Sequence, residues 1–190
     1  GSLYSDQTHF IYELLQNAED AGASEVEYHL HADHFELRHN GRPFTEDDVR
    51  GVCGVGAGTK ADDITAIGRF GVGFKSVYAF SDSPSVHSGE AHFKIERFVR
   101  PYALDPIGVA QGWTHIRLPF DKQRGPKSDD CVEDIRRGVA HLDDSSLLFL
   151  RSVRRIRFFD HVEGSRGCQE RHEWSDRGLR GLSIELEWGG

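Results

Sequence analysis

The chain has 190 residues, of which 37% are hydrophobic, and a formal net charge of −8. This length suits one domain, and the acidic balance argues against a general nucleic-acid-binding surface, which would be basic. Its three cysteines are widely spaced, which favours reduced thiols in a cytoplasmic setting over a disulfide framework. No apolar run is long enough to span a bilayer, so we expect no membrane partner.

We expect a single domain over residues 8–190, because no repeat, low-complexity tract or second-domain linker interrupts the chain. Residues 1–7 are expected to lie outside it, and Gly1 and Ser2 resemble a cloning scar. The chain contains no methionine, which suggests a piece of a longer protein.

The first predicted element is a helix over residues 8–21, followed by Gly22 as a stop signal. Its apolar residues recur at helical spacing: Phe10, Ile11, Leu14, Leu15 and Ala18. Glu13, Asn17 and Asp20 share one helix face, which borders this apolar stripe. Two interpretations stay open, namely polar groups of catalytic type and the solvated face of an amphipathic helix.

Two strands are predicted next, over residues 24–31 and 35–39, from their alternating pattern. His29 and His31 could chelate a metal, but no cysteine or carboxylate cluster with metal-site spacing accompanies them, so a solvated sheet face is favoured. A turn over residues 40–44 leads into a helix, with Thr45 as its N-cap and Asp48 as its capping partner. The glycine-rich stretch 51–63 is predicted to be a mobile lid or a disordered loop.

A second glycine-rich stretch, residues 66–78, resembles a phosphate-binding loop that opens a helix. A P-loop would need the lysine directly after the second glycine, but Phe74 stands between Gly73 and Lys75. A Rossmann fingerprint would need a third glycine where Ser76 stands, and a preceding strand. A plain surface loop that caps an ordinary helix is the remaining alternative.

The rest of the chain is predicted as strands and one further helix. The strands are expected at 85–88, 91–99 and 113–118, in a core stretch around 153–159, and at 169–174 and 182–188, on either side of a charged turn. The helix is expected at 129–141. Residues 101–111 are expected to form a connecting loop, and residues 147–150 are a short apolar run.

Taken in order, these segments resemble the nucleotide-binding boxes of the GHKL ATPases, whose fold is called the Bergerat fold. The matching segments are the N box at 13–21, the G1 region at 39–45, the lid at 58–60, the G2 box at 68–76 and a last segment at 112–118. Within this superfamily, residues 40–44, 75–78 and 147–150 most resemble the sacsin-like branch.

The resemblance implies an α+β fold: a two-layer α/β sandwich, with a mixed, mostly antiparallel sheet, helices on one face and an ATP lid. The nucleotide boxes would lie within 8–118, and residues 119–190 would add a helix and strands. The implied cofactors are ATP and Mg²⁺, bound between the helices and the sheet.

The resemblance also implies roles for individual residues. Asn17 would ligate Mg²⁺, and Glu13 would orient and deprotonate the attacking water. The remaining nucleotide contacts would come from Asp20 near the nucleoside, Thr114 at the adenine end, Thr59, Lys60, Gly68, Val72 and Lys75, and the backbone of Gly71, Gly73 and Phe74. His39 stands where the family has an aspartate that accepts a hydrogen bond from adenine. A neutral His39, or the Asn40 amide oxygen, would have to accept that bond instead.

The implied function is an ATP-binding, slowly hydrolysing module that switches conformation between its ATP and ADP states in a larger chaperone-like or defence-type protein. Its partners would be downstream domains of the same chain or a second copy, as an ATP-dependent homodimer; direct nucleic-acid binding is not expected. The alternative is a degenerate, non-catalytic module of the same fold, which His39 favours. A histidine kinase is less supported, since the lid resembles that of the chaperones and no phosphoacceptor helix is seen.

Overall fold

The structure is a computed structural model that describes residues 9–54, 73–108, 110–123, 125–142, 146–176 and 179–189. Its helices are α1 (His9–Asp20), α2 (Glu46–Cys53), the 3-10 helix η1 (Lys75–Ala79), α4 (Ser128–Ala140) and α5 (Ser146–Phe149). Its strands are β1 (Glu25–Leu30), β2 (His34–His39), β3 (Ser85–Ser88), β4 (Ala91–Glu96), β5 (Arg100–Ala103), β6 (Thr114–Pro119), β7 (Arg155–Asp160), β8 (Ser165–Asp176) and β9 (Leu179–Gly189). None of the helices in these ranges has the length and apolar character needed to cross a membrane.

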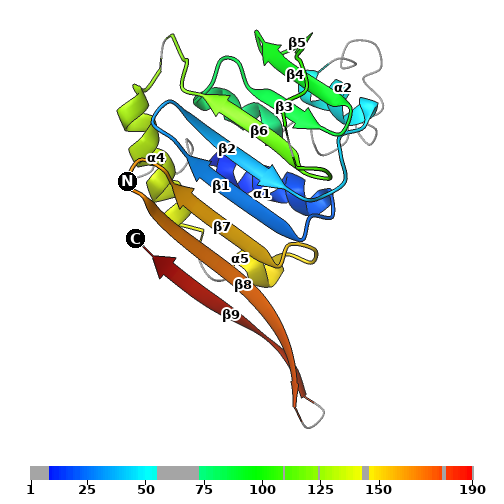
Figure 1. The fold of residues 1–190 in the computed structure, drawn as a ribbon, viewed down its shortest axis with the longest axis vertical. Coiled ribbons are helices and arrows are strands. Elements are labelled where there is room, and N and C mark those ends of the chain that lie inside the picture. The colour runs from blue at the N-terminus through cyan, green and yellow to red at the C-terminus, as the bar shows by residue number, and fades with distance from the viewer. Residues whose placement is uncertain are drawn as a thin grey trace.

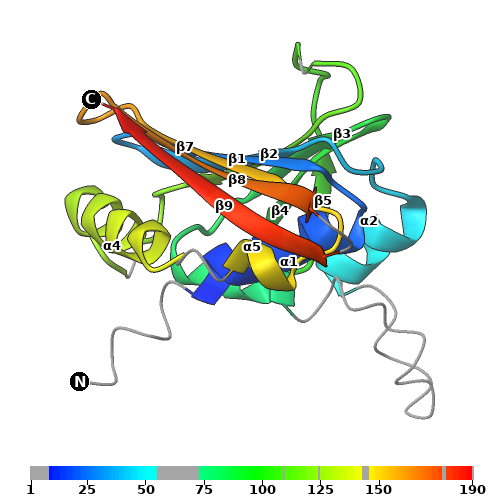
Figure 2. The same ribbon diagram turned by 90° about the horizontal axis from the view of Figure 1, so that it is seen from below.

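The strands form one open sheet in the order β5-β4-β3-β6-β2-β1-β7-β8-β9 (Figure 1). All neighbouring strands are antiparallel except β1 and β7, which are parallel. The helices α1, α2, α4 and α5 lie against one face of this sheet (Figure 2). The fold is therefore α+β with a mixed, mostly antiparallel sheet and helices on one face, which confirms the predicted two-layer sandwich.

The core forms where the apolar stripe of α1 meets the helix-facing side of the sheet. Phe10 of α1 is fully buried and packs edge-on against Phe35 of β2, with ring centroids 5.7 Å apart. It also contacts Phe80, which follows η1, at a centroid distance of 4.9 Å. In addition, the buried Tyr28 hydroxyl donates a hydrogen bond to the Ile11 carbonyl at 3.2 Å. These contacts fix the position of α1 relative to the central strands.

Most predicted elements are confirmed, including the Thr45–Asp48 capping box of α2. The predicted loop over 51–63 begins too early, because α2 continues to Cys53 and ends at Gly54, whose φ of 63° is left-handed. The predicted loop over 101–111 is wrong at its start, where β5 pairs with β4. Because β5 is an edge strand with every residue exposed, it shows no apolar alternation.

Two further elements differ from their predicted extent. The helix expected after the G2 box is the five-residue 3-10 helix η1 within the described part of the chain. The last two strands are much longer than predicted and form a hairpin that continues past β7 (Figure 1). The outer part of β8, residues 172–176, is exposed and mostly polar, so the sequence shows no apolar alternation there.

A buried ion pair joins α4 to the end of β7. The side chain of Asp160 is fully buried, and its Oδ2 accepts a hydrogen bond from Arg136 Nε at 2.8 Å. Its Oδ1 accepts the backbone N–H groups of Val162 and Glu163. Although burial opposes ionisation, these donors hold the pKa of Asp160 below its usual value.

We expect Arg136→Ala to lower the free energy of unfolding by about 3 kcal/mol, because it leaves a buried carboxylate without its cation. This value is at the lower end of the usual cost of breaking a buried ion pair, because both backbone N–H groups that bind Asp160 remain. Urea unfolding at pH 7 measures the change. The control is Arg137→Ala, in the same helix but with a half-exposed side chain, which should cost less than about 1 kcal/mol. Equal losses in the two variants would contradict this role for Arg136.

Candidate nucleotide site

Helix α1 places Glu13 and Asn17 one turn apart on one side of the helix. Asn17 is 4% exposed, and its Nδ2 has no hydrogen-bond partner among the described residues. Glu13 is half-buried, and its Oε1 lies 3.4 Å from His9 Nδ1. The sequence prediction that these two polar groups border the buried stripe is thus matched by their positions, while their chemical roles stay predictions.

Glu13 and Gly73, which are far apart in the sequence, are in direct contact. A Cβ atom built on Gly73 would lie 1.9 Å from Glu13 Oε2. The Glu13 carboxylate therefore occupies the space that any larger residue at position 73 would need. The N box and the end of the G2 box meet at this contact.

The residues after Gly73 point in different directions. Phe74 is fully buried, and Ser76 Oγ donates a hydrogen bond to the Gly73 carbonyl. Lys75 is exposed, and its Nζ lies 3.8 Å from the position of a Cβ on Gly54, at the C-terminal end of α2. A cation is favoured there by the helix dipole. In this structure Lys75 thus lies beside α2.

The other end of α1 contacts the turn after β2. The Arg42 backbone N–H donates to the Ala21 carbonyl at 2.8 Å. A Cβ on Gly41 would lie 2.9 Å from both the Cβ and the carbonyl oxygen of Ala21, so position 41 also requires close backbone approach. Helix α1 therefore spans the distance from the G2 box at Gly73 to the G1 turn.

Next to that turn, a row of buried polar side chains crosses three neighbouring strands. His39 of β2 pairs with Thr114 of β6, and Thr114 pairs with Ser88 of β3. All three side chains are at most 1% exposed. The Thr114 and Ser88 hydroxyl oxygens are 2.5 Å apart, and Ser88 Oγ also accepts the Phe44 N–H at 2.9 Å. The sequence analysis missed Ser88, although it alternates with Val86 on the helix-facing side.

His39 is neutral and presents one unpartnered nitrogen. Burial, with a smaller effect of the Arg42 charge, lowers its pKa to about 4. Its Nδ1 accepts the Gly41 N–H at 3.1 Å, which assigns the proton to Nε2. Nε2 is buried without a partner among the described residues. His39 thus offers a donor at a position where the sequence analysis expects a hydrogen-bond acceptor for adenine.

Asn40 is used by the fold. Its Oδ1 accepts the backbone N–H groups of Ser24 and Glu25, both at 2.9 Å, and its Nδ2 donates to Ser24 Oγ. The two acceptors that the sequence analysis considered for the adenine amino group, His39 Nδ1 and Asn40 Oδ1, therefore both bind backbone N–H groups in this structure.

Other predicted residues are not brought into this set. Asp20 is exposed and accepts a hydrogen bond from Gln16. Its neighbour Glu19, which the sequence analysis did not single out, accepts the backbone N–H groups of residues 151–153 and so connects α1 to the segment before β7. Five predicted residues lie outside the described residues: Thr59, Lys60, Gly68, Gly71 and Val72.

The low pKa of His39 predicts a pH dependence of stability. Its folded pKa of about 4 lies below the unfolded value of about 6.5, so between these values only the unfolded state binds the proton. Its stabilising contribution is complete above pH 6.5 and is lost as the pH falls toward 4. From pH 7 to pH 5, wild type should lose about 2 kcal/mol more than His39→Gln. Urea unfolding of both proteins at the two pH values measures this, and equal losses would contradict a buried neutral imidazole.

The described residues fit a magnesium nucleotide. Glu13 and Asn17 can supply the hard oxygen ligands that Mg²⁺ prefers, directly or through water. Two buried nitrogens, Asn17 Nδ2 and His39 Nε2, have no hydrogen-bond partner within the described residues. Buried polar atoms without a protein partner usually bind a ligand or an ordered water. Gly73 has no Cβ, and the Glu13 carboxylate lies directly against its backbone.

Comparison with known proteins shows which family the chain resembles. A family model described as "Sacsin domain" matches residues 37–96. The chain is 31% identical over 193 residues to Protein NO VEIN of Arabidopsis thaliana, a match that covers 86% of the chain and 7% of that protein. It is 38% identical over 103 residues to Sacsin of Homo sapiens, covering 45% of the chain and 2% of that protein. It is 29% identical over 183 residues to Chaperone protein HtpG of Alkalilimnicola ehrlichii, covering 75% of the chain and 28% of that protein. The chain therefore spans a minor part of each relative.

Proposed function

Because the chain contains a sacsin-like domain of the heat-shock-protein-ninety/GHKL ATPase type, we propose that it binds ATP with Mg²⁺ between α1 and the sheet. The observation that carries this proposal is the contact of Glu13 with Gly73. It places the carboxylate of the N box directly beside the backbone of the glycine-rich G2 box. Asn17 Nδ2 on α1 and His39 Nε2 on β2, which are buried without a hydrogen-bond partner among the described residues, support it.

At the phosphate end, the backbone N–H of Gly73 would donate to a phosphate oxygen. A magnesium ion, held by the Asn17 amide oxygen, would offset the charge of the phosphates. Glu13 would hold the attacking water and accept its proton. We infer slow hydrolysis, because Lys75, one of the cations predicted to contact the phosphates, lies beside α2 in this structure.

At the base end, the Nε2–H of His39 would donate a hydrogen bond to an acceptor on the base. Adenine offers N1 as an acceptor, and guanine offers O6. The aspartate expected from the family would instead accept from the adenine amino group. His39 therefore removes the usual basis for adenine selectivity, and ATP and GTP should be compared directly.

For the larger protein, we infer a nucleotide-driven switch in a chaperone-like assembly, in which binding changes contacts with other domains or with a second copy. The name of the HtpG relative, a chaperone protein, supports this. The second candidate is a non-catalytic scaffold of the same fold, which the replacement of the aspartate by His39 favours.

Thermal unfolding distinguishes the nucleotide module from the non-catalytic scaffold. It is measured with ATP, ADP, GTP or a non-hydrolysable analogue, each with and without Mg²⁺. A nucleotide at 100 times its Kd stabilises the folded state by about 2.7 kcal/mol. For a domain of this size that raises Tm by roughly 5–10 °C. Stabilisation that depends on Mg²⁺ supports the nucleotide module, and no shift with any nucleotide would support the scaffold.

A further inference from the structure

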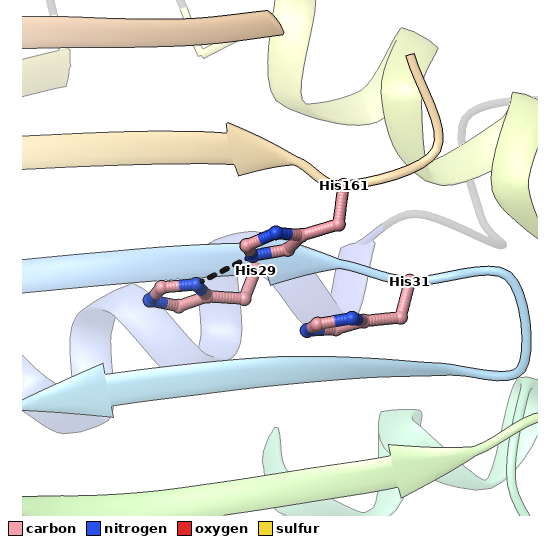
Figure 3. Close-up of side chains that lie close together, drawn as sticks. All are labelled: His29, His31 and His161. Atoms are coloured by element: carbon pink, nitrogen blue, oxygen red, sulfur yellow. Dashed lines mark hydrogen bonds between the residues drawn. The ribbon is translucent and has the colours of Figure 1, made fainter. Parts of the chain in front are cut away.

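Three histidines converge on the face of the sheet opposite the helices (Figure 3). His29 lies in β1, His31 follows the end of β1, and His161 follows the end of β7. Because β1 and β7 are parallel neighbours, their C-terminal ends lie together, with Leu30 opposite Asp160. The backbone N–H of His161 donates to the Leu30 carbonyl at 2.9 Å, which fixes the backbone at this residue beside the end of β1. We call these residues the histidine cluster.

The ring nitrogens of the histidine cluster lie close together. His29 Nδ1 lies 3.0 Å from His161 Nε2. The ring of His31 stacks on the ring of His161, with centroids 4.2 Å apart. One nitrogen from each of the three residues lies within 4.8 Å of the other two. Ligands of one tetrahedral ion bound at about 2.0–2.1 Å need a slightly closer approach than this.

His29 is held in the manner of a metal-binding histidine. Its Nε2 lies 3.1 Å from Glu27 Oε2, and the other oxygen of Glu27 pairs with Arg157 at 2.9 Å. A carboxylate that accepts the Nε2 proton fixes the ring orientation and leaves Nδ1 as the acceptor atom. Without a metal, Nδ1 accepts the hydrogen bond from His161 Nε2 at 3.0 Å (Figure 3), and an ion would take the place of that proton. The ring of Phe159 stacks on His29 at a centroid distance of 4.7 Å and restricts it further.

The other two members can turn toward an ion. The three rings are nearly parallel, within 9° and 12° of one another, so their in-plane lone pairs do not yet meet at one point. His161 is exposed and His31 is half-buried. Rotation of these two side chains, with His29 as the fixed ligand, would bring three nitrogens together and leave a fourth position open to solvent.

The neighbouring His34 does not compete as a ligand. Its Nδ1 lies 2.6 Å from Asp33 Oδ1 and its Nε2 lies 3.3 Å from Glu36 Oε1. Arg117 Nη2 also lies 3.3 Å from His34 Nδ1, so both nitrogens of this ring already have charged partners. The group formed by His31, His34 and Glu36 is also compact. It is the less favourable of the two candidate metal sites.

We propose that His29, His31 and His161 form a binding site for one late first-row divalent metal ion such as Zn²⁺, with Glu27 positioning His29. Three imidazoles and an open fourth position are a ligand set that suits Zn²⁺ and its neighbours Cu²⁺ and Ni²⁺. The site lies on the opposite face of the sheet from α1, so it is separate from the nucleotide. In the sequence, His29 and His31 alone did not favour a metal site, because the third histidine, His161, lies far along the chain.

Calorimetric titration of the metal-free protein with ZnCl₂ tests this site, using His161→Phe and His34→Phe as matched variants. Phenylalanine keeps an aromatic ring in each stack but removes both nitrogens. Because His161 is exposed, its substitution should leave the fold intact, which thermal unfolding without metal verifies. Loss of an outer hydrogen-bonding partner alone weakens metal binding about 10- to 100-fold. We therefore expect His161→Phe to weaken the tightest Zn²⁺ site by more than about 100-fold.

His34→Phe should keep the wild-type affinity within about threefold, and Glu27→Gln should weaken binding about 10- to 100-fold. Three outcomes would overturn the proposal: wild type binds no Zn²⁺, His161→Phe binds as wild type does, or His34→Phe loses as much affinity as His161→Phe. Co²⁺ substitution gives an independent readout, because its visible absorption bands report the coordination geometry.

Discussion

Glu13→Ala is expected to slow ATP hydrolysis by about 10²- to 10⁴-fold, the usual contribution of a general base. ATP affinity should change little, because Asn17 and the backbone of Gly73 remain. Phosphate release in a single turnover, with protein in excess over ATP, measures the chemical step even if overall turnover is slow. Calorimetry on the same variant measures the affinity.

Two controls sharpen this prediction. Glu13→Gln keeps the side-chain shape against Gly73 but cannot accept a proton, so it should be as slow as Glu13→Ala. Gln16→Ala changes an exposed residue of the same helix and should leave the rate unchanged. A rate in Glu13→Gln equal to that of wild type would remove the general-base assignment.

Gly73→Ala is expected to slow hydrolysis by about 100-fold or more, because displacement of a reacting group by about 1 Å can cost that much. The new Cβ would lie 1.9 Å from Glu13 Oε2, so the carboxylate must move. Since this carboxylate is the far end of a flexible side chain, the free energy of unfolding should fall by less than about 1 kcal/mol. Single-turnover rates and urea unfolding together measure the two effects.

The combination of Gly73→Ala with Glu13→Ala distinguishes this explanation from a general disturbance of the loop. If alanine at 73 acts by displacing Glu13, the double variant should hydrolyse ATP no more slowly than Glu13→Ala alone. Multiplied losses in the double variant would show that Gly73 acts independently of Glu13.

The sequence was sufficient for features that depend on local periodicity. The helical spacing in α1 predicted both the buried stripe and the shared face of Glu13 and Asn17. Alternation predicted the strand that contains Thr114, and the spacing from Thr45 to Asp48 predicted the capping box. Each of these features is decided by residues within a few positions of one another.

Other features depend on contacts between distant segments, which no local pattern contains. The neutral state of His39 requires its burial, and the use of Asn40 as a turn anchor requires the backbone at Ser24 and Glu25. His161 joins His29 only because β7 runs parallel to β1. Asp20 was expected near the nucleoside, but it is exposed at the C-terminal end of α1, where its carboxylate accepts a hydrogen bond from Gln16.

Titration of the protein with ATP by calorimetry, in Mg²⁺ and in EDTA, tests nucleotide binding most directly when wild type and Asn17→Ala are compared. We expect saturable one-site binding by wild type in Mg²⁺. Affinity should fall about 10- to 100-fold in Asn17→Ala, as is usual when a polar contact to a charged group is lost. EDTA should weaken wild type far more than the variant, because Asn17 is the proposed ligand. No binding by wild type, or equal affinity and equal Mg²⁺ dependence in Asn17→Ala, would contradict a magnesium nucleotide held by α1.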